Sequence, residues 1–328
     1  MFFNTVLRCC DLSLRFCFAT LLGVIAAGAH TGYFLAFFRL VWHGASVSVI
    51  EVRGLRKSYG ENLAVAGIDL SIAQGEIFAL LGPNGAGKTT TVEILEGFRD
   101  RDSGEISVLG HDPQRSDKSG RIWRNRIGIV LQATSDAGDL RVSECIEHFA
   151  KYYSNPRDPE SVIAAVGLSD KRDDLIRNLS GGQRRRLDVA LGIIGNPELL
   201  FLDEPTTGFD PEARRAFWEL IRSLQSDGTT ILLTTHYLDE AEALADRVAV
   251  INHGKILEIA TPQKLGGRST SLTKVQWLEN GEIRSEESSE PTAVVKRLAS
   301  QFPGEIPGLT ISRPTLEDVY LTMIGGAE

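Results

Sequence analysis

The chain has 328 residues and a formal net charge of −8, with 42% hydrophobic and 24% charged residues. This length and composition allow one large domain with a smaller addition, and the negative charge does not favour nucleic-acid binding. The four cysteines are Cys9, Cys10, Cys17 and Cys145. They form no disulfide framework or metal-binding spacing, which excludes a disulfide-stapled secreted domain and suits a reducing cytoplasm.

An apolar run opens the chain. Residues 16–38 contain no Asp, Glu, Lys or Arg, and Arg15 and Arg39 flank them. At ~1.5 Å per residue the run is long enough to cross a bilayer core of ~30 Å. One interpretation is therefore a single N-terminal transmembrane anchor. Polar residues such as His30 and Thr31 weaken the run.

A phosphate-binding loop is predicted where the apolar, strand-length run 76–81 ends. The pattern G-x-x-x-x-G-K-[ST] is met by Gly82, Pro83, Asn84, Gly85, Ala86, Gly87, Lys88 and Thr89, followed by Thr90. Apolar residues at 92, 94 and 95 favour a helix after the loop. We expect Lys88 to reach the β- and γ-phosphates of a nucleotide and the Thr89 hydroxyl to hold Mg²⁺. A glycine-rich turn without a ligand would match only the glycines.

Residues of about 133–178 are expected to be helical, with Val142–Tyr153 and Pro159–Val166 as two of the helices. Ser180 then resembles a helix N-cap, because apolar residues follow at helical spacing. Gly181 and Gly182 would leave the first backbone N–H groups of this helix open to an anion. Gln183 completes the segment 179–183.

A buried strand is predicted at residues 199–202, directly before Asp203 and Glu204. Ligands of open α/β sheets bind at the carboxyl ends of the strands. We expect Asp203 to hold the Mg²⁺ shell and Glu204 to orient and deprotonate an attacking water. The alternative is a strand that ends in a solvated acidic turn.

These motifs and their order resemble the ATPase domains of the ATP-binding-cassette (ABC) family, whose members drive membrane transporters. The resemblance covers roughly residues 47–256. It implies a P-loop NTPase α/β fold, with a mixed sheet core and a helical subdomain at about 133–180, in a domain of residues 47–265. It also implies ATP and Mg²⁺ as cofactors and ATP hydrolysis as the activity.

The resemblance assigns further roles. Tyr59 is similar to the aromatic residue that stacks on adenine, and Gln132 to the glutamine that touches Mg²⁺ and the attacking water. Asp210 resembles the aspartate at the dimer interface, and His236 the histidine that contacts the γ-phosphate. Each has a plainer alternative: a strand-end tyrosine, a loop glutamine, a helix N-cap before Pro211, and a capping or core histidine.

In this family the segment 180–183 faces the nucleotide bound by the other subunit, so two ATP molecules are enclosed in a head-to-tail dimer. The expected partners are a second copy or a related ATPase, together with a separate integral-membrane permease. The expected location is the cytoplasmic face of the cell membrane.

Residues 266–328 are expected to form a small α+β accessory domain. With the terminal segment 314–321, this domain resembles the ATPases of antibiotic- and multidrug-resistance exporters of the second ABC export class. The function expected is therefore the motor of an exporter of drugs, antibiotics or other hydrophobic compounds. The alternative is a soluble single-cassette ABC ATPase with a role outside transport.

The family resemblance starts abruptly at Val47. We therefore expect residues 1–46 to be a translated upstream region, with Val47 as the native start. The alternative is the transmembrane anchor described above.

Overall fold

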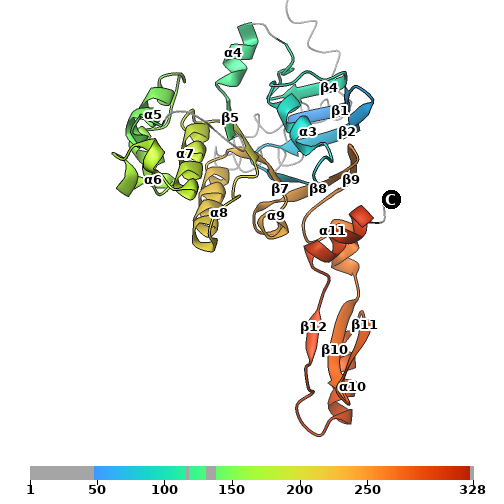
Figure 1. Cartoon of the computed structure of the whole chain (residues 1–328). Helices are drawn as coiled ribbons and strands as arrows, with labels where there is room; N and C mark the ends of the chain where they lie inside the picture. Colours follow the sequence, from blue (N-terminus) through green and yellow to red (C-terminus); the bar gives the residue numbers. More distant parts are fainter. Residues whose placement is uncertain (1–47, 116–117, 131–137, 326–328) are drawn as a thin grey trace, which may run out of the picture. The chain divides into compact units, whose positions relative to one another are not determined.

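The structure is a computed structural model that describes residues 48–115, 118–130 and 138–325 (Figure 1). The expected N-terminal extension, 1–46, and Gln132 lie outside these ranges. Within the described part of the chain, no helix has both the length and the hydropathy needed to cross a membrane.

A six-stranded sheet forms the centre of the ATPase domain, in the order β5-β6-β7-β3-β8-β9. Its strands are β3 (Ile77–Leu81), β5 (Ile127–Val130), β6 (Leu199–Asp203), β7 (Thr230–Thr235), β8 (Arg247–Asn252) and β9 (Lys255–Ala260). Neighbouring strands run parallel except β8 and β9, which are antiparallel. The predicted strands at 76–81 and 199–202 are thus confirmed, and so is the mixed sheet.

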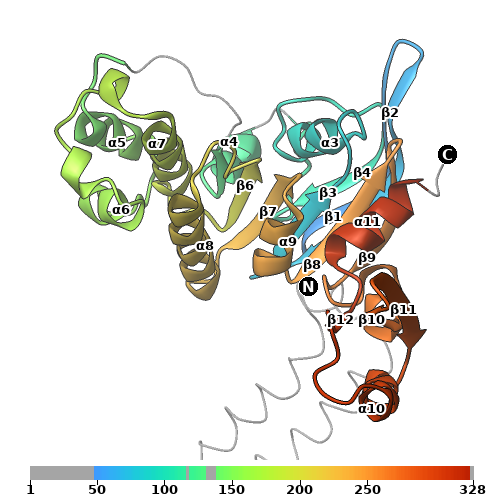
Figure 2. The ribbon, with the colours of Figure 1, turned by 60° about the horizontal axis from the view of Figure 1, so that its bottom comes forward.

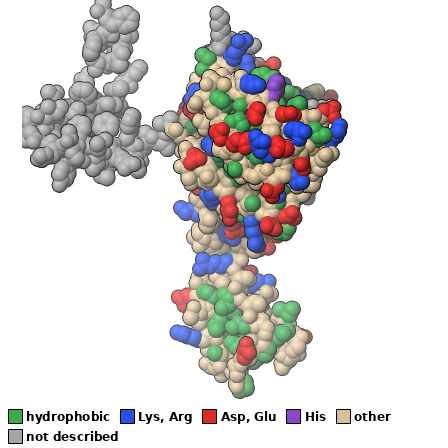
Figure 3. All heavy atoms as spheres, turned by 90° about the vertical axis from the view of Figure 1, so that its left-hand side faces the viewer, with side chains coloured by type: hydrophobic (Ala, Val, Ile, Leu, Met, Phe, Trp, Pro, Cys, Tyr) green, Lys and Arg blue, Asp and Glu red, His purple; other side chains and the backbone are tan. Residues whose placement is uncertain are grey.

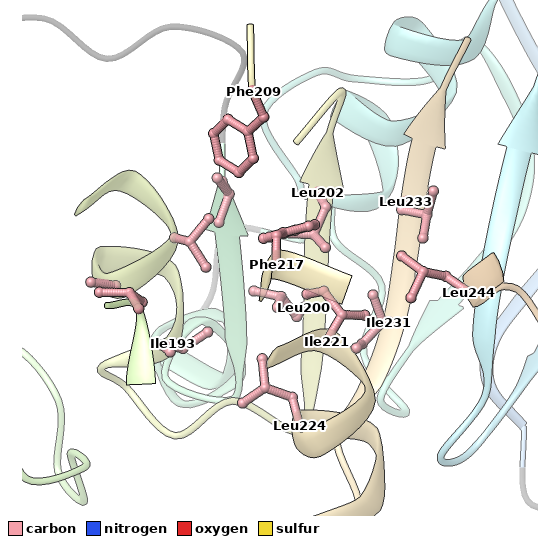
Figure 4. Close-up of a cluster of buried hydrophobic side chains, with 14 of the residues drawn as sticks. Ile193, Leu200, Leu202, Phe209, Phe217, Ile221, Leu224, Ile231, Leu233 and Leu244 are labelled. Carbon is pink, nitrogen blue, oxygen red and sulfur yellow. The ribbon is translucent and has the colours of Figure 1, made fainter. Parts of the chain in front are cut away.

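Both faces of the central sheet are covered, and this explains the continuous apolar runs of its strands. Along β3, Ile77, Ala79 and Leu81 join one buried cluster, whereas Phe78 and Leu80 join another. The first cluster packs against α7 (Gly181–Ile193), α8 (Pro211–Ser226) and α9 (Leu238–Leu244). In Figure 4, side chains of α8 such as Phe217 and Ile221 face Leu200 of β6 and Ile231 of β7.

The second cluster lies between the central sheet, helix α3 (Lys88–Leu95) and a three-stranded antiparallel sheet. That sheet has the order β2-β1-β4, with β1 (Ser48–Tyr59), β2 (Asn62–Ala73) and β4 (Ser103–Val108). The short helix α4 (Lys118–Arg124) follows β4 and precedes β5. The helix predicted after the phosphate loop is confirmed as α3.

A helical segment follows β5 (Figure 2). It contains α5 (Val142–Ala150), α6 (Pro159–Ala165), two short 3₁₀ turns, η3 (Ser169–Lys171) and η4 (Ile176–Asn178), and then α7. The two predicted helices, 142–153 and 159–166, are confirmed with slightly earlier C-terminal ends. Helix α7 packs against α5 and α6 and also against β5, so it contacts both the helical segment and the central sheet.

Beyond β9 the chain forms the 3₁₀ segment η5 (Leu265–Thr270), strands β10 (Thr273–Glu279) and β11 (Glu282–Ser288), α10 (Pro291–Gln301), β12 (Thr310–Ser312) and α11 (Leu316–Gly325). The sheet β11-β10-β12 and α10 share a small core of Val275, Val294, Leu298 and Ile306. In contrast, Leu265 and Leu316 belong to the core of the ATPase domain. Apolar side chains are also exposed on the small sheet, among them Leu278 and Ile283. Figure 3 shows that hydrophobic side chains gather on the face of this part turned to the viewer.

Candidate nucleotide-binding and hydrolysis site

The phosphate loop connects β3 to α3, at the carboxyl end of the central sheet. Two of its glycines are required by the packing of the chain itself. A Cβ on Gly82 would lie 2.3 Å from the carbonyl oxygen of Ile251, and one on Gly87 would lie 2.3 Å from that of Ala64. Gly87 also has φ 102° and caps α3, a conformation that other residues adopt only with strain. The loop is therefore held tightly between β2 and β8.

Lys88 is buried at the first turn of α3. Its Nζ donates to the carbonyl oxygens of Gly82, at 2.8 Å, and Pro83, at 3.1 Å. Burial lowers the pKa of Lys88, while the charges of Glu204 and Asp203 act in the opposite direction. Thr89 is exposed and Thr90 half-buried, so the Thr89 hydroxyl is accessible to a metal ion. Among the other loop residues Asn84 and Gly85 are exposed, and Ala86 is buried.

The predicted carboxylates end β6 beside β7. The Thr234 hydroxyl donates to Asp203 Oδ1, and Glu204 N donates to Thr234 O at 3.1 Å. Glu204 has φ 46°, a left-handed conformation that is uncommon for a residue with a side chain. This turn directs its carboxylate toward His236, whose Nδ1 lies 3.3 Å from Glu204 Oε1. The two residues predicted to act on the γ-phosphate and the water are thus brought together.

Glu96 is a buried carboxylate near Asp203 that the sequence did not indicate. Burial, and then the negative charges of Asp203 and Glu93, raise its pKa to about 8. It lies at the C-cap of α3. A glutamate at the end of a helix is ordinarily solvated, so only the three-dimensional arrangement distinguishes this one.

Tyr59 is the last residue of β1 and is 40% exposed. Lys57 Nζ lies 5.7 Å from the ring centroid, and the Arg99 guanidinium carbon lies 5.3 Å from it. Arg99 Nε in turn donates to Glu93 Oε2 at 2.6 Å. An exposed ring held in this way is suited to stacking on a base, and it also fits the plainer interpretation of a strand-end tyrosine.

The segment 180–183 forms the start of α7, and the predicted N-cap is confirmed. Gln183 N donates to Ser180 Oγ at 3.3 Å, and Ser180 N donates to Gln183 Oε1 at 3.0 Å, which together make a capping box. Gly181 is exposed and Gly182 half-buried. Apart from its chain neighbours and the backbone of α7 itself, a Cβ on either glycine would meet no atom of the described chain within 4 Å.

Asp210 caps α8, as its plainer interpretation predicts, with Ala213 N donating to Oδ1 at 2.8 Å and Pro211 at the first helical position. This contact leaves its expected role at a dimer interface untested. Gln132, expected to touch Mg²⁺ and the water, lies outside the described residues.

The site fits a Mg²⁺–nucleotide. Lys88 and the N-terminus of α3 supply positive potential for phosphates, and Asp203 and Thr89 offer the oxygen ligands that Mg²⁺ prefers. No cluster of three or more His, Cys, Asp or Glu residues suited to a metal occurs in the described ranges.

Comparison with known proteins points to the same chemistry. The family model described as "ABC transporter" matches residues 65–207. A daunorubicin/doxorubicin resistance ATP-binding protein of Streptomyces peucetius is 36% identical over 307 residues, covering 84% of this chain and 92% of the relative. The Nod factor export ATP-binding protein I of Ralstonia nicotianae is 37% identical over 308 residues, covering 85% and 95%.

Solved structures agree on the fold. An ATP-binding subunit of an ABC transporter superposes with a TM-score of 0.60 at 24% identity, covering 66% of this chain and 91% of that one. A dimeric bacterial ABC transporter cassette superposes with a TM-score of 0.59 at 23% identity, covering 65% and 98%. At these identities the likeness shows the fold alone. The two relatives named above are 36% and 37% identical over most of both chains, and they therefore show the family as well as the fold. This protein belongs to the ABC transporter family, as one of its ATP-hydrolysing subunits.

Proposed function

We propose that this chain powers a separate membrane permease as an exporter motor, and that it works as an ATP-dependent dimer with a second copy or a related ATPase. The observation that carries the dimer is the start of α7. Gly181 and Gly182 lower helix stability by up to about 1 kcal/mol each relative to alanine, and the described chain contains no packing reason for them. Glycines there make sense if a phosphate approaches the backbone from outside the subunit.

In the proposed reaction Lys88 and the loop amides bind the phosphates, while Glu204 takes a proton from the attacking water. His236 lies against Glu204 and contacts the γ-phosphate, so it holds both the base and the phosphate in place. When bound, Mg²⁺ neutralises charge on the phosphates, and Thr89, Asp203 and Gln132 would hold it. Tyr59 stacks on the adenine.

Light scattering tests the dimer. Glu204→Gln protein should be a dimer with Mg²⁺ and ATP and a monomer without nucleotide, because ATP is bound but not hydrolysed. Adding Ser180→Arg should abolish the dimer while ATP binding by the monomer persists. Ser223→Arg, an exposed serine of α8, is the matched control and should leave the dimer intact. An unchanged mass with and without ATP would contradict the proposal.

The proposed cargo is a drug, an antibiotic or another hydrophobic compound, since the relatives are named for daunorubicin/doxorubicin resistance and Nod factor export. The proposed location is the cytoplasmic face of the membrane, through the permease. Deleting the gene should lower tolerance to at least one such compound, and a plasmid copy should restore it. A Glu204→Gln copy should not. Unchanged tolerance across an anthracycline-containing panel would contradict the cargo and leave the dimer test unaffected.

A further inference from the structure

Helix α7 contains both the glycine segment, at its start, and a buried arginine, Arg185, in its next turn. Its first turn is the glycine segment at Ser180, which faces outward. One turn later, at the i+3 and i+4 positions from Gly182 and Gly181, Arg185 is 6% exposed and its side chain reaches the end of β6. Leu187, Ala190 and Ile193 of the same helix are buried against the central sheet. Because successive turns of a helix are joined by hydrogen bonds, a displacement of the first turn would also move Arg185, which lies one turn further on.

The Arg185 guanidinium contacts three consecutive backbone carbonyls at the end of β6. Nη2 donates to Asp203 O at 2.7 Å and to Glu204 O at 3.3 Å, and Nε donates to Pro205 O at 3.1 Å. These three residues form the end of β6 and the turn after it, and this turn carries the carboxylate of Glu204. One side chain of α7 thus holds the backbone that carries both the aspartate expected to bind the metal and the expected general base.

This backbone needs such support. Glu204 has φ 46°, and left-handed residues other than glycine cost of order 1–3 kcal/mol, persisting only where their surroundings fix them. Arginine suits the task because its planar fork presents several N–H donors in fixed directions, whereas lysine offers a single point charge. Burial lowers the pKa of Arg185, and Asp188 is the first of several carboxylates that offset this effect.

We propose that Arg185 is a positioning residue that links the outward-facing start of α7 to the backbone of Asp203 and Glu204. This inference rests on the proposed dimer. The start of α7 meets the partner's nucleotide, and Glu204 acts on the nucleotide of its own subunit. Arg185 therefore connects the two ATP sites, so that the base is correctly placed only when the neighbouring site is occupied.

The neighbouring arginines provide matched controls. Arg184 Nη2 donates to Ile176 O at 2.9 Å and Arg186 Nη1 donates to Gly167 O at 3.2 Å, both within the helical segment. Arg185→Lys should lower kcat for ATP by about 10- to 100-fold, the scale expected when a reacting group is misplaced by about 1 Å. KM should change less than threefold, because Lys88 and the loop are untouched. Arg186→Lys should leave both constants within about twofold of the parent.

A double-mutant cycle separates a link from simple support of the fold. If Arg185 transmits the state of the α7 start, the effects of Ser180→Ala and Arg185→Lys on kcat should be non-additive by at least about fivefold, since both break one connection. The pair Ser180→Ala and Arg186→Lys should be additive. Unchanged kcat in folded Arg185→Lys protein, or additive losses, would overturn the inference.

A second measurement leaves Arg185 intact and so does not depend on how its variants fold. In Glu204→Gln protein with Mg²⁺ and ATP, Ser180→Ala should speed hydrogen exchange of the backbone amides of residues 204, 206 and 207, with no change at the phosphate loop. Equal exchange with and without Ser180→Ala would overturn the link. If the Glu204→Gln parent forms no ATP-dependent dimer, the proposed function itself fails, and this inference falls with it.

Discussion

The phosphate loop and the start of α7 both place glycines at the N-terminus of a helix, yet for different reasons. In the loop, a Cβ on Gly82 or Gly87 would meet a backbone carbonyl at 2.3 Å. At Gly181 and Gly182 it would meet nothing within 4 Å in the described chain. The glycines of the first site are required by the subunit's own packing, whereas those of the second have open space beside them, which the proposed dimer would fill with the partner's nucleotide. Glycines at the N-terminus of a helix can therefore have different structural reasons within one chain.

The largest effect is expected when the proposed general base of the subunit's own ATP site is removed. Glu204→Gln should lower ATP turnover by about 10²–10⁴-fold, the usual contribution of a general base. ATP affinity should persist, because Lys88 and the loop are unchanged. Steady-state hydrolysis and equilibrium titration measure the two quantities. Glu219→Gln, on the exposed face of α8, is the control, and equal turnover in the two variants would refute the assignment.

The two glycine sites should respond to alanine with opposite signs. Gly87→Ala should destabilise the nucleotide-free protein by about 1–3 kcal/mol from backbone strain alone, in addition to the clash with Ala64 O. Gly182→Ala should be neutral or stabilise it by up to about 1 kcal/mol. Urea unfolding of both variants and the parent gives the free energies. Equal losses of stability would remove the distinction between the sites.

Tyr59→Ala should weaken ATP binding by about 1–3 kcal/mol, the stacking contribution of a base on an aromatic ring. Binding to the loop would otherwise be unchanged, so inorganic triphosphate should bind both proteins equally. Tyr152→Ala is a suitable control, because this tyrosine is 67% exposed in the helical segment. If ATP affinity is the same in all three proteins, Tyr59 is only a strand-end residue.

The last prediction concerns pH. Glu96 has a pKa of about 8 in the folded protein, against 4.5 for the ordinary side chain. Between these values the folded state holds the extra proton, so this group's contribution to stability is complete below pH 4.5 and is lost as pH rises to 8. The slope is at most about 1.4 kcal/mol per pH unit. In EDTA, Glu96→Gln should lose less stability than the parent between pH 6 and 8, as measured by denaturant unfolding. Parallel pH profiles would contradict this.

Local patterns allowed much of the fold and site to be predicted. The strand at 199–202, the Ser180 cap and the Asp210 cap each follow from a few neighbouring residues. Arg184, Arg185 and Arg186 could not be told apart in this way. Their separate partners, Ile176 O, the carbonyls of residues 203–205, and Gly167 O, depend on how distant segments pack. Glu96 was missed for the same reason, since its burial and then the nearby charge of Asp203, more than a hundred residues away in the chain, depend on tertiary packing.

Helix α11 makes the end of the chain part of the ATPase domain. A Cβ on Gly266 would lie 2.2 Å from Val319 Cγ1, and Arg268 donates to Pro314 O at 2.8 Å while its guanidinium lies 2.8 Å from Glu242 of α9. The strands β10–β12 and α10 are thus an insertion with both ends anchored, not a tail. A chain that stops before Leu316 would lack α11 and would leave apolar residues of the ATPase core without their packing partner. Replacing residues 272–312 with a short linker should leave this contact of α11 in place, because neither η5 nor α11 is changed.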